Sequence, residues 1–148
     1  MTLADAHHPL PPITLGELLH ECADKYSERP FITIAETGAT ISYGEFEALT
    51  NRLARGLRSN CRQGSVYVAI MLENGIEYLA ASYALKKADR VEVSINRAFR
   101  GPALARMIDL TGARVLFTSD AHLDALNQIR ESIPRIQTLI VIGSTARA

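Results

Sequence analysis

The chain has 148 residues, 47% of them hydrophobic, and is long enough to bury one core. Sixteen Lys and Arg residues balance sixteen Asp and Glu residues, which excludes the strong positive charge that favours nucleic acid or anionic membranes. Two cysteines suit a reducing compartment, and the longest apolar run, residues 66–72, is far shorter than the ~20 residues that span a bilayer. We therefore expect a cytoplasmic protein that binds no nucleic acid and has no membrane span.

The first residues predict a loose arm followed by a helix. Residues 1–12 are rich in proline and carry no secretory signal, so we expect a flexible arm before an α/β unit at residues 13–148. Thr14 and Glu17 form a capping-box pattern at the start of an amphipathic stretch. This stretch predicts a helix that ends before the Arg-Pro pair at 29–30.

A hairpin and a long helix are expected next. Short β-branched runs at 31–34 and 40–41 flank a glycine-containing turn, which is typical of a hairpin. Ser42 and Glu45 repeat the capping-box pattern. Apolar residues at helical spacing then predict a helix that ends near Asn60.

The central segment predicts a strand, a helix and a second strand. Residues 66–72 form an uncharged, β-branched run, typical of a strand buried on both faces. Residues 76–88 have helical periodicity, with Lys86 and Lys87 in the last turn, where the helix dipole favours cations. Residues 91–95 are again short and β-branched. Elements of these lengths indicate a right-handed crossover between parallel strands.

The remaining residues continue the alternation. We expect a helix at Gly101–Leu110, a strand at 114–118, a helix at 120–132 and a strand at 137–142. The predicted fold class is therefore α/β, with a mostly parallel sheet, helices on both faces and a short N-terminal β-hairpin.

Six segments together resemble one known family. Three of them are Ala-Ile-Met-Leu-x-Asn at 69–74, Ala-Leu-x-Lys-Ala at 84–88 and Val-x-Val-x-Ile-Asn at 91–96. The others lie at 40–46, 52–57 and 113–118. In this order they resemble the N-terminal region of the adenylate-forming (AMP-binding) superfamily, which contains acyl-CoA synthetases, luciferases and nonribosomal-peptide adenylation domains. The resemblance extends from about residue 15 to residue 142, and implies the N-terminal lobe of that enzyme fold.

The resemblance also implies an activity for a complete enzyme. Such an enzyme joins a carboxylic acid to ATP with the help of Mg²⁺, releases pyrophosphate and passes the acyl group to CoA, as in fatty acid metabolism. The family binds ATP phosphates with a Ser/Thr/Gly-rich loop ending in Pro-Lys, and no such loop occurs between residues 1 and 148. We therefore expect a portion that stops before this loop, has no catalytic or metal-binding residue, binds no cofactor alone and is inactive alone.

Few residues stand out as site candidates. The resemblance implies that Lys87 contacts a phosphate of CoA; alternatively, Lys87 only offsets the helix dipole and stays solvated. Asn74 is expected to cap the following helix, although its place at a strand end also suits ligand contact. Ser119 or Asp120 is expected to be an N-cap, rather than part of a catalytic triad with His122.

The chain departs from the family pattern beside Lys87. Asp89 and Arg90 replace a Gly-Ala pair, and Ser94 replaces a proline. A glycine after a helix adopts a left-handed conformation easily, whereas aspartate does so at some cost. These changes leave two explanations open: the chain is a divergent member of the family, or it has lost the function of the family.

Two other functions remain open. The chain could be a free-standing α/β module that binds a small ligand at its strand ends, or a truncated relative that acts as an interaction or dimerisation protein. We expect exposed apolar sheet surface that is covered by the remainder of the enzyme or by a second copy. The sequence distinguishes neither these functions nor a short natural protein from a fragment.

Overall fold

The structure is a computed structural model that describes residues 13–60 and 66–143. The predicted arm at residues 1–12 and Cys61 lie outside these ranges. The described elements, in chain order, are α1 (Leu15–Tyr26), β1 (Pro30–Thr33), β2 (Thr40–Ser42), α2 (Tyr43–Asn60), β3 (Tyr67–Met71), α3 (Ile76–Lys87), β4 (Val91–Ser94), α4 (Gly101–Leu110), β5 (Val115–Ser119), α5 (Leu123–Asn127) and β6 (Thr138–Ile142).

Four strands form one parallel sheet in the order β4-β3-β5-β6. β1 and β2 form a separate antiparallel pair. The two central strands are the most deeply buried, and all five residues of β5 are buried. This confirms the predicted parallel sheet and hairpin, and the burial of β3 explains the continuous apolar run at residues 66–72.

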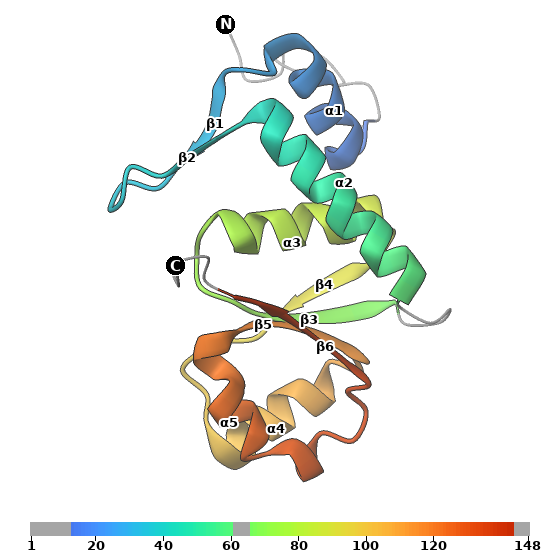
Figure 1. Cartoon of the computed structure of the whole chain (residues 1–148). Helices are drawn as coiled ribbons and strands as arrows, with labels where there is room; N and C mark the ends of the chain where they lie inside the picture. Colours follow the sequence, from blue (N-terminus) through green and yellow to red (C-terminus); the bar gives the residue numbers. More distant parts are fainter. Residues whose placement is uncertain (1–12, 61–65, 144–148) are drawn as a thin grey trace, which may run out of the picture.

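Helices cover both faces of the sheet, as predicted (Figure 1). Alternate side chains of β3 point to opposite faces: Val68 and Ile70 pack with α2 and α3, while Ala69 and Met71 pack with α4 and α5. The helix that contacts the first face most closely, α3, buries the alanines that the sequence places at helical spacing: Ala80, Ala81 and Ala84. Small side chains let α3 lie between the sheet and α2 (Figure 1).

An aromatic cluster attaches the hairpin and α1 to the rest of the fold. The ring of Phe31 on β1 lies 4.5 Å from Tyr43 and 5.1 Å from Phe46, measured between ring centroids. Phe46 in turn meets Tyr83 of α3 edge-on at 5.3 Å. A two-stranded hairpin is marginal alone, so this cluster stabilises it.

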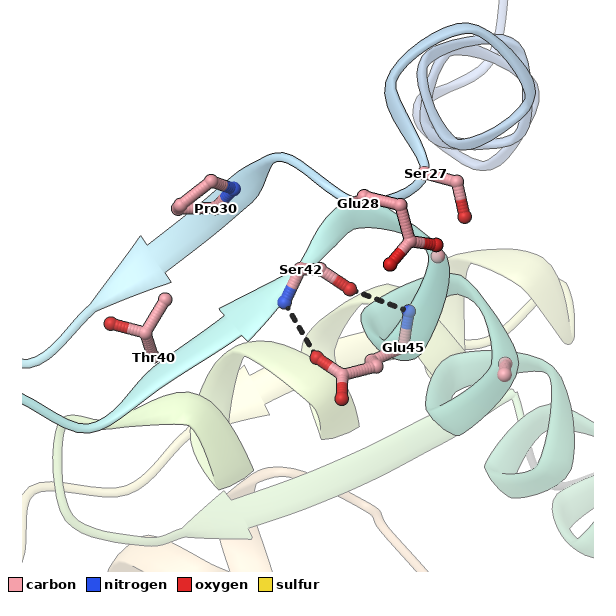
Figure 2. Close-up of a pocket in the computed structure, with 8 residues that line it drawn as sticks. Ser27, Glu28, Pro30, Thr40, Ser42 and Glu45 are labelled. Carbon is pink, nitrogen blue, oxygen red and sulfur yellow. Dashed lines mark hydrogen bonds between the residues drawn. The ribbon is translucent and has the colours of Figure 1, made fainter.

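Both predicted capping boxes form. Thr14 and Glu17 close the first turn of α1. Ser42 and Glu45 do the same for α2: the Ser42 amide donates to the Glu45 carboxylate at 2.9 Å, and the Glu45 amide donates to the Ser42 hydroxyl (Figure 2). A Cβ on Gly44 would overlap the Ser27 hydroxyl. The Tyr-Gly-Glu segment at 43–45 therefore serves packing and capping.

The predicted continuous helix at 120–132 is wrong. The segment contains only α5, flanked by short 3-10 turns at Asp120–His122 and Arg130–Ser132. The Ile129 and Ser132 amides bond three residues back instead of four, which tightens and interrupts the helix. Leu126 and Ile129 still point into the core.

The end of α3 contains a left-handed aspartate. Asp89 has φ 56°, the only positive φ of a non-glycine residue in the described part of the chain. The Arg90 amide donates to the Leu85 carbonyl at 2.9 Å, which completes a Schellman-type helix end. Asp89 thus adopts the left-handed conformation that glycine usually adopts after a helix, as predicted from the sequence.

Replacing Asp89 with glycine should stabilise the fold. We expect Asp89→Gly to raise the free energy of unfolding by about 1 kcal/mol, because glycine adopts this conformation without steric cost. Glu21→Gly, in the exposed middle of α1, is the matched control and should lose a similar amount. Urea unfolding measures both changes; an Asp89→Gly variant that is less stable than the original would contradict this reading.

Candidate functional site

Lys87 lies at a junction of three helices. Its Nζ forms an ion pair with Glu47 Oε2 and donates to Asn51 Oδ1 at 2.9 Å, both on α2. The Lys87 and Glu47 side chains are only 10% and 12% exposed. His20 of α1 approaches the same carboxylate, with Nδ1 3.4 Å from Oε1. The alternative that Lys87 stays solvated is therefore wrong.

A groove of about 620 Å³ runs past this junction. Its charged lining residues include cations from α2 and α3 together with carboxylates: Arg55, Arg58, Lys86, Lys87, Glu17, Glu47 and Asp89. Arg58 donates to the main-chain carbonyl of Lys87 at the end of α3. The groove thus has mixed charge, and a phosphate that approached Lys87 would compete with Glu47.

The other lysine of α3 belongs to a separate polar network. Lys86 Nζ lies 3.0 Å from Glu92 Oε2, and the same oxygen accepts from the Ser82 hydroxyl at 2.6 Å. The Tyr78 hydroxyl donates to Glu92 Oε1 at 2.7 Å and lies 2.8 Å from Ser94 Oγ. Ser94 therefore makes a hydrogen bond that the family's proline cannot make, so this departure has a structural use.

This network shifts the titration of Glu92. Burial raises the pKa of the Glu92 carboxyl, but hydrogen bonds from Ser82, Tyr78 and Lys86 and the charge of Lys86 outweigh burial and lower the pKa to about 2. Glu92 lies on an edge strand. An inward-pointing charge at an edge also discourages pairing with another strand.

A third site lies at the carboxyl ends of the strands. We call it the terminal cavity; its volume is about 380 Å³, and it is lined by Leu72, Glu73, Asn74, Glu77, Ser119, Asp120, Ala121, Ile142 and Gly143. Beside it, Glu73 Oε1 lies 2.8 Å from His122 Nε2 and 3.6 Å from Arg97 Nη1. Three loops, which follow β3, β4 and β5, meet here.

Local contacts also lower the pKa of Glu73. Partial burial raises the pKa of this carboxyl, but its own amide, the nearby Ser119 hydroxyl and the charges of His122 and Arg97 outweigh burial. The His122 side chain is only 8% exposed. The cluster of Glu73, Arg97 and His122 was not predicted from the sequence. These residues lie in loops that follow parallel strands, and such loops meet at one edge of the sheet, so the strand pattern could have indicated the cluster.

Of the caps predicted at the carboxyl ends of the strands, the one at Asn74 is wrong and the one at Ser119 is confirmed in position only. Asn74 does not cap α3, because the N-cap is Gly75 and no side chain bonds there; Asn74 lines the terminal cavity instead. Ser119 does occupy an N-cap position, yet its side chain makes no capping bond. The structure brings Ser119 and His122 together around Glu73, without the serine-to-histidine arrangement of a triad.

Within residues 13–60 and 66–143, no group of three or more His, Cys, Asp or Glu side chains is placed to hold a metal ion. Within the same ranges, none of the helices has the length and hydrophobicity needed to cross a bilayer.

The contact between Lys87 and Glu47 should stabilise the fold strongly. We expect Lys87→Ala to lower the free energy of unfolding by about 2 to 3 kcal/mol, because it removes the lysine partner of a mostly buried carboxylate. Arg52→Ala, an exposed position on the same helix α2, should change stability by less than about 0.5 kcal/mol. In urea unfolding, Glu47→Leu combined with Lys87→Met should recover most of the loss; equal small effects of Lys87→Ala and Arg52→Ala would refute the proposed role.

Glu92 should make stability depend on pH in the acid range. Its pKa in the folded state is about 2, against an ordinary value of 4.5. Its contribution is therefore complete above pH 4.5 and disappears as the pH falls through about 2. We expect Glu92→Gln to be less stable than the original chain at pH 7, with a difference that shrinks below pH 4.5 in urea titrations. Glu131→Gln, at an exposed position, should show no such trend; a constant Glu92→Gln difference down to pH 3 would disprove the assignment.

Comparisons with known proteins agree with this fold. The family described as AMP-binding enzyme matches residues 19–147. Among curated relatives, 4-coumarate–CoA ligase 3 of Arabidopsis thaliana is 26% identical over 76% of the chain, and an acyl-CoA ligase of Ajellomyces capsulatus is 29% identical over 78%; each alignment covers 20% of the relative.

Solved structures give the same result. A long-chain-fatty-acid–CoA ligase from Archaeoglobus fulgidus superposes with a TM-score of 0.82 and 21% identity, covering 93% of this chain and 29% of the ligase. A fatty acyl CoA synthetase of Mycobacterium tuberculosis superposes with a TM-score of 0.78 and 20% identity, covering 87% of this chain and 26% of the synthetase. These likenesses establish the shared fold, and the chain spans less than a third of each relative. The match over residues 19–147 shows that the chain belongs to the AMP-binding enzyme family.

Proposed function

We propose that this chain forms the N-terminal portion of an ATP-dependent, AMP-forming acyl-CoA synthetase. The complete enzyme would convert a carboxylic acid, ATP and CoA into acyl-CoA, AMP and pyrophosphate, with Mg²⁺, in the cytoplasm. The observation that carries the proposal is the family match over residues 19–147, together with relatives that are named CoA ligases.

Within such an enzyme, this portion would supply scaffold rather than chemistry. The two lysines at the end of α3 have ion-pair partners within the fold: Lys87 pairs with Glu47, and Lys86 pairs with Glu92. A contact between Lys87 and a CoA phosphate stays a proposal. It would require the phosphate to replace Glu47 as the partner of Lys87, with Arg55 and Arg58 lining the same groove.

We further propose that the outer edge of the sheet is covered by the remainder of the enzyme. β6 is an edge strand, its residues carry no charge, and Leu139 and Val141 are 42% and 43% exposed. The opposite edge strand, β4, has the inward charge of Glu92, whereas β6 has no such protection. A second copy of the chain is the alternative occupant, and would correspond to a dimerisation protein.

The proposed function predicts activity in the native protein and none in the 148-residue chain alone. An antibody raised against this chain would purify the native protein from source cells, and we expect a larger protein that catalyses acid-dependent ATP–pyrophosphate exchange and acyl-CoA formation. The purified chain alone should give background exchange, because loss of even one charge-stabilising donor can cost ~10²-fold or more.

The outcomes separate the alternatives. Exchange by the 148-residue chain would overturn its assignment as a portion without catalytic groups. A native protein of about this length without exchange activity would overturn the synthetase proposal and favour the binding or dimerisation alternatives.

A further inference from the structure

The turn between β3 and α3 contains an asparagine followed by a glycine, Asn74-Gly75. Five asparagines occur in the chain, and only Asn74 precedes a glycine. Asn74 is exposed to solvent, and its side chain does not cap α3. The capping role that the sequence suggested for this pair is therefore not its role in the fold.

Neither amide of this pair is engaged. Within the part of the chain that the structure describes, the Asn74 side chain and the Gly75 backbone amide form no hydrogen bond. Gly75 is extended, with φ 170°, so the backbone conformation does not itself require glycine. Because glycine has no Cβ, the approach of another atom to its nitrogen is open.

The contacts of three other asparagines differ. Asn51 Oδ1 accepts from Lys87 at 2.9 Å, and Asn96 Oδ1 accepts from the Ala98 amide at 2.8 Å. The amide that follows Asn127 already donates to a main-chain carbonyl at the end of α5. Each of these three asparagines precedes an arginine or a glutamine, whose side chain crowds the backbone nitrogen. The chain thus contains its own controls for a reaction at Asn74.

We propose that Asn74 is a site of spontaneous deamidation. The Gly75 nitrogen loses its proton to solvent hydroxide and attacks Cγ of Asn74, so that a C–N bond forms and the side-chain nitrogen leaves as ammonia. Water then opens the resulting succinimide ring. Cleavage at Cγ gives aspartate, and cleavage at the main-chain carbonyl gives isoaspartate, in which the chain continues through the former side chain. The net reaction consumes water and releases ammonia.

The modification would act on the connection between the sheet and α3. Isoaspartate adds a carbon atom to the backbone between β3 and α3, and α3 lies between the sheet and α2 (Figure 1). Both products also add a negative charge between Glu73 and Glu77, which carry the same charge. We therefore expect the modified chain to unfold at a lower urea concentration. This inference does not depend on the proposed synthetase activity.

Peptide mapping of the aged chain tests the proposal. The purified chain is incubated in its folded state at about pH 8 and 37 °C and then digested; mass spectrometry and a protein isoaspartate methyltransferase detect the products. We expect a mass increase of about 1 Da at Asn74, together with isoaspartate, before any change at Asn51, Asn96 or Asn127. A parallel sample in urea gives the rate without the fold. Deamidation of Asn74 in urea but not in the folded chain would overturn the proposal.

Gly75→Ala is the matched variant, because it keeps Asn74 and hinders only the attacking nitrogen. A Cβ on Gly75 would meet only a terminal carboxylate oxygen of Glu77, at 3.2 Å, which a flexible side chain can move away. We expect deamidation to slow by about tenfold or more, and the urea midpoint to survive ageing. Gly56→Ala in α2, where a Cβ has free space, should leave the rate at Asn74 unchanged.

Equal rates in the original chain and in Gly75→Ala would overturn the proposed mechanism. If Gly75→Ala fails to fold, the comparison of Asn74 with the other asparagines of the original chain still decides the outcome. Acid-dependent exchange by the native protein is measured separately, so failure of either proposal leaves the other intact.

Discussion

The ion pair between Lys87 of α3 and Glu47 of α2 joins the N-terminal helices to the helix that packs on the sheet. Helix α3 packs its alanines on the sheet, while its Tyr83 meets the aromatic cluster that holds the hairpin. The lysine lies in the last turn of the same helix, where α1 and α2 converge. A mostly buried charge pair is a weak source of stability but a strong constraint on geometry, so it fixes how the N-terminal helices sit on the sheet.

The sequence predicted the fold well because the fold depends on local patterns. Capping boxes at Thr14 and Ser42, the apolar run of β3 and the helical spacing in α3 each have a short-range cause. The helix expected at 120–132 is interrupted after α5, where the Ile129 and Ser132 amides bond three residues back, a change that the apolar spacing of the sequence does not reveal. The partners of Lys87, on a helix about forty residues earlier in the chain, and the group around Glu73 depend on tertiary packing, which periodicity does not contain.

The segments of the chain that resemble adenylate-forming enzymes form helices, strands and caps of the fold. Gly44, in a segment that resembles the family, allows a close approach to Ser27. Two departures from the family pattern also have structural roles: Asp89 ends α3, and Ser94 joins the Glu92 network. The departures from the family pattern at Asp89 and Ser94 are therefore accommodated by specific contacts, and do not by themselves indicate lost function.

Native-state hydrogen exchange in low urea tests most directly whether α3 makes the chain one cooperative unit. The account predicts that the most protected amides of α1, α2, β3 and β5 open together, with the same free energy and the same urea dependence. Exchange of α1 and the hairpin through a separate opening of lower energy, while the sheet stays protected, would contradict it.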